Sequence, residues 1–365
     1  MKLSATREAF LEPLQAVIGV VERRQTMPIL ANVLIIAQDD AVSVTATDLE
    51  VEMVAGADIV VGQSGEVTLP GRKLLDICRA LKDKAKVELT VSGEKATVRS
   101  GRSRFTLATL PAGEFPVIED INAQEQIVLT QASMHKLLEK THFSMAHQDV
   151  RYYLNGLLLE IGKGHLRAVA TDGHRLALCD VDAEGTATAG RQVIVPRKGV
   201  LELQRLVGKE GDLNLAIGNN HIRAEVGDIR FTTKLIDGRF PDYQRVIPKL
   251  GENNITADRE DLRQALYRAA ILSNEKYRGI RMELSGGGLR IQAHNPEQEE
   301  AEEEIEVGYD GEAMEIGFNV NYLLDALDAL DGETASFQVN DPSSSCLMWD
   351  DETPGCRYVV MPMRL

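Results

Sequence analysis

The sequence has no apolar run close to the eighteen residues that a membrane-spanning helix needs, so we expect no transmembrane segment. Its first ten residues, MKLSATREAF, lack the apolar stretch of a secretory signal peptide. The four cysteines are scattered and none forms a CxxC motif: Cys78, Cys179, Cys346 and Cys356. Disulfides and a cysteine-based zinc site are therefore not expected, and a reducing cytoplasm is the predicted location.

The chain has fewer basic than acidic residues, 40 against 56, and its formal net charge is −16. Taken alone, this balance argues against a polyanionic partner. The distribution is uneven, however: residues 71–86 carry a net charge of +4, residues 196–209 carry +3, and residues 319–333 carry −4. Basic helices could face a polyanion through phosphate contacts that are independent of sequence and sensitive to salt. An ordinary charged helix surface is the alternative.

The 365 residues contain three repeats of one pattern of predicted helices and strands. Each copy starts with a helical pattern behind a Thr or Asp suited to an N-cap, continues with alternating strands and a polar turn, and ends with a second helix and more strands. The turns centre on Asp48, Asp172 and Asn295, which are 124 and 123 residues apart. The predicted helices are 6–21, 69–81, 130–145, 195–207, 258–272 and 318–330. Pro13 should bend the first helix or delay its start.

The stretch VATDGHRLALC, residues 169–179, places an acid two residues before an imidazole. Asp172 and His174 could serve as a general base with its orienting carboxylate, or as half of a metal site. Asp-Gly between two alternating runs more strongly indicates a surface hairpin. No nucleophile, metal-ligand cluster or phosphate loop accompanies the pair, which argues against catalysis. A third interpretation makes His174 and Arg175 the wall of a binding site.

Two strand-like stretches carry opposite charge. Residues 98–105 (VRSGRSRF) contain Arg99, Arg102 and Arg104, and residues 296–306 (PEQEEAEEEIE) contain seven glutamates. A charge run is usually a solvated face. A basic edge in the first repeat and an acidic edge in the third are nevertheless complementary, and head-to-tail contacts of that kind can close into a ring.

The whole chain resembles the bacterial DNA polymerase III beta subunits, the sliding clamps. The resemblance rests on stretches in all three repeats, among them MPILANVLI, SGRSRFTLATLPAGEFP, HQDVRYYLNG, ATDGHRLALC, DGRFPDYQRVIP, NPEQEEAEE and the terminal YVVMPMRL. It implies an α+β fold of three repeated clamp-type domains, each built as helix, strands, helix and strands. The expected domains are 1–121, 127–248 and 253–365.

The resemblance also implies a head-to-tail dimeric ring, with helices lining a central hole and sheets outside. Twelve helices side by side, each roughly 10 Å wide, span a circle roughly 38 Å across between helix centres, which leaves room for duplex DNA. Such a ring would encircle DNA without sequence preference and tether the replicative polymerase for processivity. It would be non-catalytic and would need no cofactor or metal. Its other implied partners are an ATP-driven clamp loader and further polymerases and repair proteins that bind through short peptides.

Three sets of site residues follow from the resemblance alone. The implied DNA contacts are Arg24, Arg72, Gln148, Tyr152, Tyr153 and Lys198. The implied peptide pocket consists of Leu154, Thr171, Gly173, His174, Arg175, Leu176, Pro241, Val246, Tyr322, Val359, Met361, Pro362, Met363 and Arg364. The expected dimer contacts are Lys73, Ile77, Arg104, Phe105 and Leu107 on one side and Ile271 and Leu272 on the other. The role of Ser343 and Ser345, at the pocket rim, stays open.

Two other functions are kept as alternatives. One is a hydrolase that depends on Asp172 and His174, which turnover by the purified chain would support. The other is an adhesive scaffold of three repeats with no role at nucleic acids, which a failure to load on circular DNA would favour.

Overall fold

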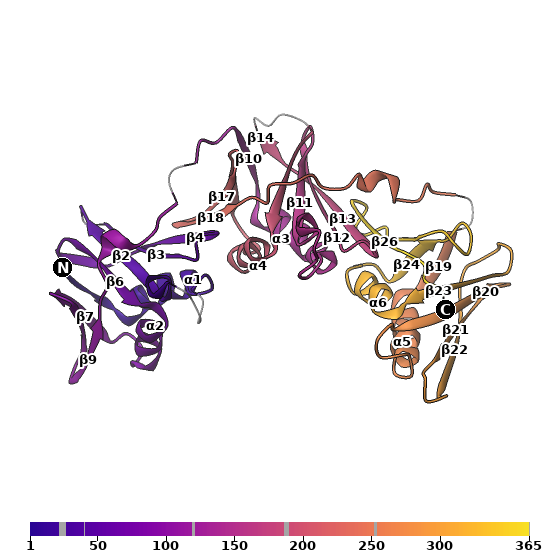
Figure 1. Ribbon diagram of the computed structural model, residues 1–365, viewed down its shortest axis with the longest axis horizontal. Helices are drawn as coiled ribbons and strands as arrows, with labels where there is room; N and C mark the ends of the chain where they lie inside the picture. Colours follow the sequence, from indigo (N-terminus) through magenta and orange to yellow (C-terminus); the bar gives the residue numbers. More distant parts are fainter. Residues whose placement is uncertain (22–26, 40, 119–120, 186–189, 252–253, 365) are drawn as a thin grey trace. The chain divides into compact units, whose positions relative to one another are not determined.

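The computed structural model describes residues 1–21, 27–39, 41–118, 121–185, 190–251 and 254–364. Within them, the chain forms six α-helices and four antiparallel sheets (Figure 1). It divides into two compact units, one with residues 1–134, 184–187 and 198–235, the other with residues 135–183, 188–197 and 236–365. No helix among the described residues is both long and apolar enough to cross a membrane.

The first unit contains two sheets. The smaller has the strand order β5-β1-β7-β8-β9, with bounds Val60–Gln63, Lys2–Thr6, Lys86–Ser92, Lys95–Ser100 and Ser103–Ala108. The larger has the order β14-β10-β16-β17-β18-β4-β3-β2-β6, with bounds Glu184–Gly185, Glu125–Thr130, Asp212–Ile217, His221–Val226, Ile229–Lys234, Val51–Ala57, Ala41–Thr47, Asn32–Gln38 and Gly65–Pro70. Helices α1 (Arg7–Val17) and α2 (Gly71–Ala80) pack against each other, and α4 (Arg197–Leu206) belongs to this unit from its second residue.

The second unit also contains two sheets. One has the order β15-β11-β12-β13-β26-β25-β24-β19, with bounds Arg191–Pro196, Gly156–Ile161, His165–Thr171, Arg175–Asp182, Cys356–Val360, Cys346–Trp349, Thr334–Gln338 and Asn254–Asp258. The other has the order β22-β21-β20-β23, with bounds Glu300–Glu306, Gly288–His294, Gly279–Ser285 and Met314–Asn319. Helices α5 (Arg259–Ala270) and α6 (Val320–Asp328) pack side by side, and α3 (Gln131–Glu139) ends in this unit (Figure 1).

The strand order shows the threefold repeat directly. Each third of the chain supplies two four-stranded sets: β1-β7-β8-β9 with β4-β3-β2-β6, then β10-β16-β17-β18 with β13-β12-β11-β15, and finally β19-β24-β25-β26 with β22-β21-β20-β23. Neighbouring repeats are joined where an edge strand of one set pairs with an edge strand of the next. These joints are β4 with β18 in the first unit and β13 with β26 in the second. The two sets of the middle repeat therefore fall in different units.

A helix forms in each of the six predicted ranges, although α1 ends at Val17 and α3 at Glu139, short of the predicted 21 and 145. The N-cap residues expected for the first helix of each repeat are confirmed. Thr6, Thr130 and Asp258 each accept a hydrogen bond from a backbone N–H in the first turn of α1, α3 and α5. Such caps satisfy amides that have no partner inside the helix. The expected late start of the first helix is wrong, because α1 begins at Arg7 and continues through Pro13. Pro13 is buried on the apolar face of α1, and that packing offsets the hydrogen bond that its nitrogen cannot donate.

Candidate functional site

The hairpin between β12 and β13 is held by its own side chains. The Asp172 carboxylate accepts hydrogen bonds from the amides of His174 (2.9 Å) and Arg175 (3.0 Å). The Thr171 hydroxyl donates to the carbonyl of Arg175 and accepts from the amide of Gly173, whose φ of +89° suits a residue without a Cβ. Asp172 therefore builds the turn and does not orient the His174 imidazole as a catalytic dyad would require.

The first repeat contains the same type of turn. Asp48 accepts from the amides of Glu50 (2.9 Å) and Val51 (2.7 Å), and Thr47 donates to the carbonyl of Val51. Leu49 takes the place of Gly173 at φ +80°, a conformation that a leucine adopts only when its surroundings enforce it. The hairpin expected from the Asp-Gly pair is confirmed, and its cause is an aspartate-capped turn.

Arg175 joins this hairpin to α6. Its guanidinium pairs with the Asp325 carboxylate, donates to the carbonyl of Phe143 at 2.8 Å, and lies over the Tyr322 ring at 4.6 Å from the ring centre. Stacking on an aromatic face and ion pairing act together here because the side chain is largely buried. Burial is also the main reason why the pKa of Tyr322 is raised, and Asp172 adds to that effect. Asp325 and Phe143 are site residues that sequence reasoning missed.

His174 and the end of the chain come together beside Tyr322. The His174 ring is stacked on the Tyr322 ring with centroids 6.4 Å apart and an 18° angle between planes. The amide of Met361 donates to the carbonyl of His174 at 2.9 Å, which continues the pairing of β13 with β26. The amide of Met363 donates to the carbonyl of Gly317 in β23, while Arg364 is exposed.

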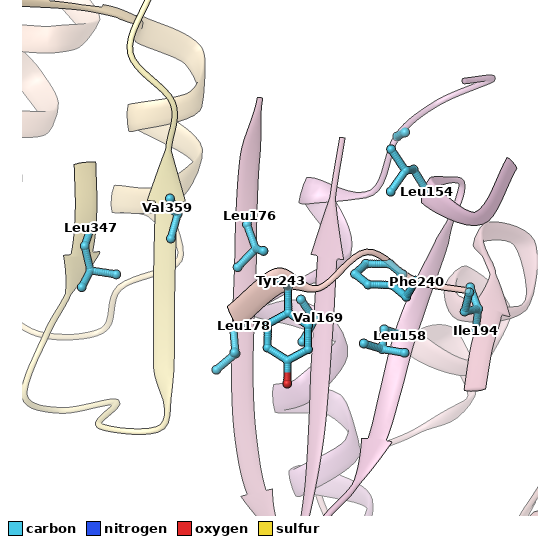
Figure 2. Packing of buried hydrophobic residues seen from close by; sticks show 11 residues of the cluster. Leu154, Leu158, Val169, Leu176, Leu178, Ile194, Phe240, Tyr243, Leu347 and Val359 are labelled. Carbon is cyan, nitrogen blue, oxygen red and sulfur yellow. The ribbon is translucent and has the colours of Figure 1, made fainter. Parts of the chain in front are cut away.

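An apolar cluster that includes residues of the same strands contains several of the implied pocket residues. Leu154, Leu176 and Val359 belong to it, and Val246 packs against it. Figure 2 shows Leu176 on β13 next to Val359 on β26, with Phe240, the neighbour of Pro241, in the same cluster. At the rim, the Ser345 hydroxyl lies 2.9 Å from the Met361 sulfur, and Ser343 hydrogen-bonds to Asp341. Thr171, Gly173 and Pro362 lie in the hairpin and tail described above.

The implied DNA contacts differ in whether their side chains are bonded within the chain or exposed to solvent. Arg24 lies outside the described residues. Arg72 donates to the carbonyl of Val21, and Lys198 forms an ion pair with Asp48, so both cations are engaged within the first unit. In the second unit, Tyr152 is 57 % exposed and meets Tyr153 edge to face, with ring centres 5.8 Å apart.

Gln148 lies in the same loop as these tyrosines. It is exposed and has a φ of +56°, a conformation that a non-glycine residue rarely adopts. A structured, solvent-exposed loop with two tyrosines can stack on bases or sugars. Bonds between Asp149, Arg151 and Asn155 hold this loop, which leaves the exposed Gln148 and Tyr152 side chains at its surface.

The expected dimer contacts lie at the two opposite ends of the repeat series. Lys73 and Arg104 are exposed, Ile77 and Phe105 are partly buried, and Leu107 is only 8 % exposed. On the other side, Leu272 is partly buried and Ile271 is 68 % exposed. Ile271 thus offers a large apolar surface to a partner, whereas Leu107 offers little.

The described part of the chain contains no group of three or more His, Cys, Asp or Glu side chains placed to hold a metal ion. The candidate site instead combines an apolar cluster with a histidine, an arginine and a tyrosine that contact one another. Sites of this make-up bind short peptides through a few anchor side chains. The molecule is thus a three-repeat clamp in which His174, Arg175 and Tyr322 gather beside the joint of β13 and β26.

Comparisons with known proteins agree with this class. Family models of the DNA polymerase III beta subunit match the chain domain by domain: the N-terminal domain over residues 1–119, the central domain over 128–242 and the C-terminal domain over 244–364. The chain is 52 % identical over 367 aligned residues to the beta sliding clamps of Pseudomonas aeruginosa and Escherichia coli, covering each protein completely. The crystal structure of the Pseudomonas aeruginosa subunit superimposes over the full length of both chains with a TM-score of 0.97 and 51 % identity.

The chain therefore belongs to the DNA polymerase III beta subunit family, the bacterial sliding clamps. Members of this family are non-catalytic processivity factors of DNA replication, and the resemblance found in the sequence is confirmed. The hydrolase alternative finds no support, either in the family or in the hydrogen bonds that occupy Asp172.

Proposed function

We propose that two copies of this chain close head to tail into a ring around duplex DNA, and that this ring is how the chain acts as a sliding clamp. The observation that carries the proposal is the repeated joint. Twice within the chain, the edge strand that follows the turn of one repeat pairs antiparallel with the last strand of the next, as β4 with β18 and β13 with β26.

If every repeat followed this pairing pattern, two edge strands would still lack a partner within the chain. In the third repeat the equivalent of β4 and β13 is β22, which ends its sheet, and in the first repeat the equivalent of β18 and β26 is β9, which also ends its sheet. Exposed sheet edges readily pair with another chain. Pairing β22 of one copy with β9 of the next repeats the joint a third time, and two such contacts close a ring.

Charge and apolar surface favour this pairing. β22 carries glutamates at five of its seven positions, while β9 contains Arg104 and follows a hairpin with Arg99 and Arg102. Ile271, just after α5, is the apolar anchor, and Phe105 lies on β9. Apolar centres usually supply most of the affinity of such interfaces, and the charges at the rim guide association.

The hole of this ring would be lined by the helices, and the sheets would lie outside. Residues 71–86 and 196–209 supply the positive charge, although Arg72 and Lys198 are already engaged within the chain. Weak, salt-sensitive contacts of this kind suit a protein that must slide along DNA. The exposed loop with Gln148, Tyr152 and Tyr153 would supply additional contacts to the duplex.

We further propose that the site around His174, Arg175, Tyr322 and Met361 binds short peptides of the polymerase III catalytic subunit, the clamp loader, and other polymerases and repair proteins. An apolar floor with adaptable methionines at its edge suits a series of related peptides. The division into domains at 1–121, 127–248 and 253–365 and a cytoplasmic location belong to the same proposal.

Sedimentation tests the ring. Ile271→Ala and Leu272→Ala each remove part of the apolar anchor, so we expect both to shift the protein from dimer to monomer at micromolar concentration. Val150→Ala is the control, because Val150 is 96 % exposed and lies far in sequence from both edges. If both variants remain dimers like the control, the contact between copies lies elsewhere.

A further inference from the structure

Two cysteines face each other across the joint of β13 and β26. Cys179 and Cys356 are direct partners in the strand register, their sulfur atoms are 2.7 Å apart, and both side chains are fully buried. They are 177 residues apart in the sequence, which is why their spacing gave no sign of a pair.

The hydrogen bonding around them shows that the pair has the geometry for a crosslink. The amide of Met361 bonds to His174, and the amide of Asp180 bonds to Gly355 at 3.0 Å. These directly opposed pairs alternate with pairs that share no hydrogen bond, and Cys179 with Cys356 is of the second kind. Such pairs have Cα atoms about 4.5 Å apart, which lies within the range that a disulfide spans without backbone movement.

The surroundings favour a reactive thiolate. The hydrogen bond between the two thiols lowers the pKa of Cys356 against the effect of burial, and the positive charges of Lys136 and Lys140 lower it further. The same bond, together with burial, raises the pKa of Cys179. Positive charge near a thiol favours its thiolate, which is the nucleophile, so Cys356 is the better candidate of the two for the first attack.

The other two cysteines provide an internal comparison. Burial raises the pKa of Cys78 to about 11 and that of Cys346 to about 12. Both are free thiols, and neither faces another cysteine in the described strand pairings. They are therefore expected to resist oxidation.

We propose that Cys179 and Cys356 form an oxidant-sensitive pair that closes a disulfide across the joint of the second and third repeats. The Cys356 thiolate attacks hydrogen peroxide, which gives a sulfenic acid and hydroxide. The Cys179 sulfur then attacks the sulfenic sulfur, forms the S–S bond and expels a second hydroxide. The two thiol protons convert both hydroxides to water, so two thiols and one peroxide give one disulfide and two waters.

The position of the two cysteines in the strand ladder determines how an oxidant can reach them and which strands the disulfide would join. Cys179 and Cys356 lie at the end of this ladder, with only the bond of the Asp180 amide to Gly355 beyond them, so local opening there breaks few bonds. In a reducing compartment the two cysteines stay as free thiols, and an oxidant converts them to the disulfide. The bond would fix β13 to β26, the strands that carry Leu176 and Val359 side by side (Figure 2). The chemistry does not depend on the proposed ring.

Mass spectrometry of the full-length protein tests the proposal. The protein is treated with hydrogen peroxide, denatured, alkylated, and digested with trypsin and chymotrypsin, which cleaves after Trp349 and so separates Cys346 from Cys356. We expect a peptide that contains Cys179 linked to one that contains Cys356, with the loss of two hydrogen atoms. Dithiothreitol should reverse the link, and Cys78 and Cys346 should be recovered alkylated.

Three variants sharpen the result. Cys356→Ala should abolish the link and Cys346→Ala should leave it unchanged, while Lys136→Gln should slow its formation several-fold without preventing it. The wild-type measurement needs no variant, so a poorly folding one does not decide the outcome. Alkylation of both Cys179 and Cys356 after peroxide treatment, or overoxidation of Cys356 without the link, would overturn the proposal.

Discussion

Among single residues, Arg175 does the most to shape the candidate peptide site. It binds Asp325 on α6, the carbonyl of Phe143 and the Tyr322 ring at once, and so fixes the hairpin against the helix. His174 has fewer contacts, a stack on Tyr322 and a backbone bond to Met361. Arg175 therefore supports the hairpin against α6, whereas His174 forms part of the wall of the candidate site.

That difference predicts an order of effects on peptide binding. His174→Ala removes one packing contact and should weaken a partner peptide containing Gln and Leu or Phe by about 1 kcal/mol, roughly fivefold. Arg175→Ala leaves Asp325 without its partner and loosens the hairpin, so it should cost about 2–3 kcal/mol. Calorimetry with the peptide measures both. The order would be contradicted if His174→Ala had the larger effect in proteins with the same circular dichroism spectrum.

The assignment of His174 to the peptide site rests on the resemblance of ATDGHRLALC to the family and stays a prediction, whereas the hairpin that carries it was predictable from the Asp-Gly pair. The surroundings of His174 were not predictable. Arg175 and Asp325 are 150 residues apart, and no periodicity links them. Likewise, nothing in the sequence shows that Arg72 turns to the carbonyl of Val21 or that Lys198 pairs with Asp48, since such partners depend on where distant segments end up after folding.

At the level of elements, β26 and the residues after it connect the joint to the proposed peptide site. β26 pairs with β13 over Cys356–Val360, and the amide of Met361 extends the pairing to His174. The position of these elements was largely predictable, because helix periodicity, N-cap residues and the repeat spacing all agree. The unbroken course of α1 through Pro13 was not, since local propensity cannot show that burial of its apolar face outweighs a missing hydrogen bond.

Deletion of residues 361–365 should therefore separate two functions. The strand β26 stays intact, so the fold and the dimer should be unchanged, whereas the wall opposite His174 is lost and peptide binding should fall below detection. Calorimetry with the peptide and sedimentation of the same preparation measure the two effects. A truncated dimer that binds the peptide with unchanged affinity would show that the pocket lies elsewhere.

A single carboxylate holds the loop after α6 against the loop between β25 and β26. Asp350 accepts hydrogen bonds from the amides of Asp331 (2.7 Å), Gly332 (2.8 Å) and Thr353 (2.7 Å). Burial alone would raise the pKa of Asp350, but these bonds and the Thr353 hydroxyl outweigh it and lower the pKa. Its contribution to stability is therefore fully present above its unfolded pKa of about 3.9, and is lost as the pH falls through the lower folded value.

Asp350→Asn should lower the free energy of unfolding by about 2 kcal/mol near neutral pH, since an amide nitrogen cannot accept from the amides that the carboxylate serves. The difference from wild type should persist at pH 5 and shrink only below about pH 4. Thermal unfolding as a function of pH measures it, with the exposed Asp351→Asn as control. A constant difference down to pH 2 would contradict the role assigned to the charge.

For the whole molecule, the threefold repeat explains how a chain with a net charge of −16 can work on DNA. The glutamates of β22 lie on a sheet edge, whereas the basic segments 71–86 and 196–209 contain α2 and α4. The proposed ring would hold DNA by topology, so these helices would need to supply only weak contacts. Total charge therefore says little about the partner, and its distribution over helices and sheet edges says more.

The most direct test of this mechanism is retention on circular DNA. Purified protein is loaded on a nicked circle, separated from free protein by gel filtration, and followed after a restriction enzyme cuts the circle once. A ring that holds DNA by topology should stay with the closed circle at moderate salt and leave within minutes of linearisation. Equal retention on circular and linear DNA, or none on either after loading, would contradict encirclement as the mechanism.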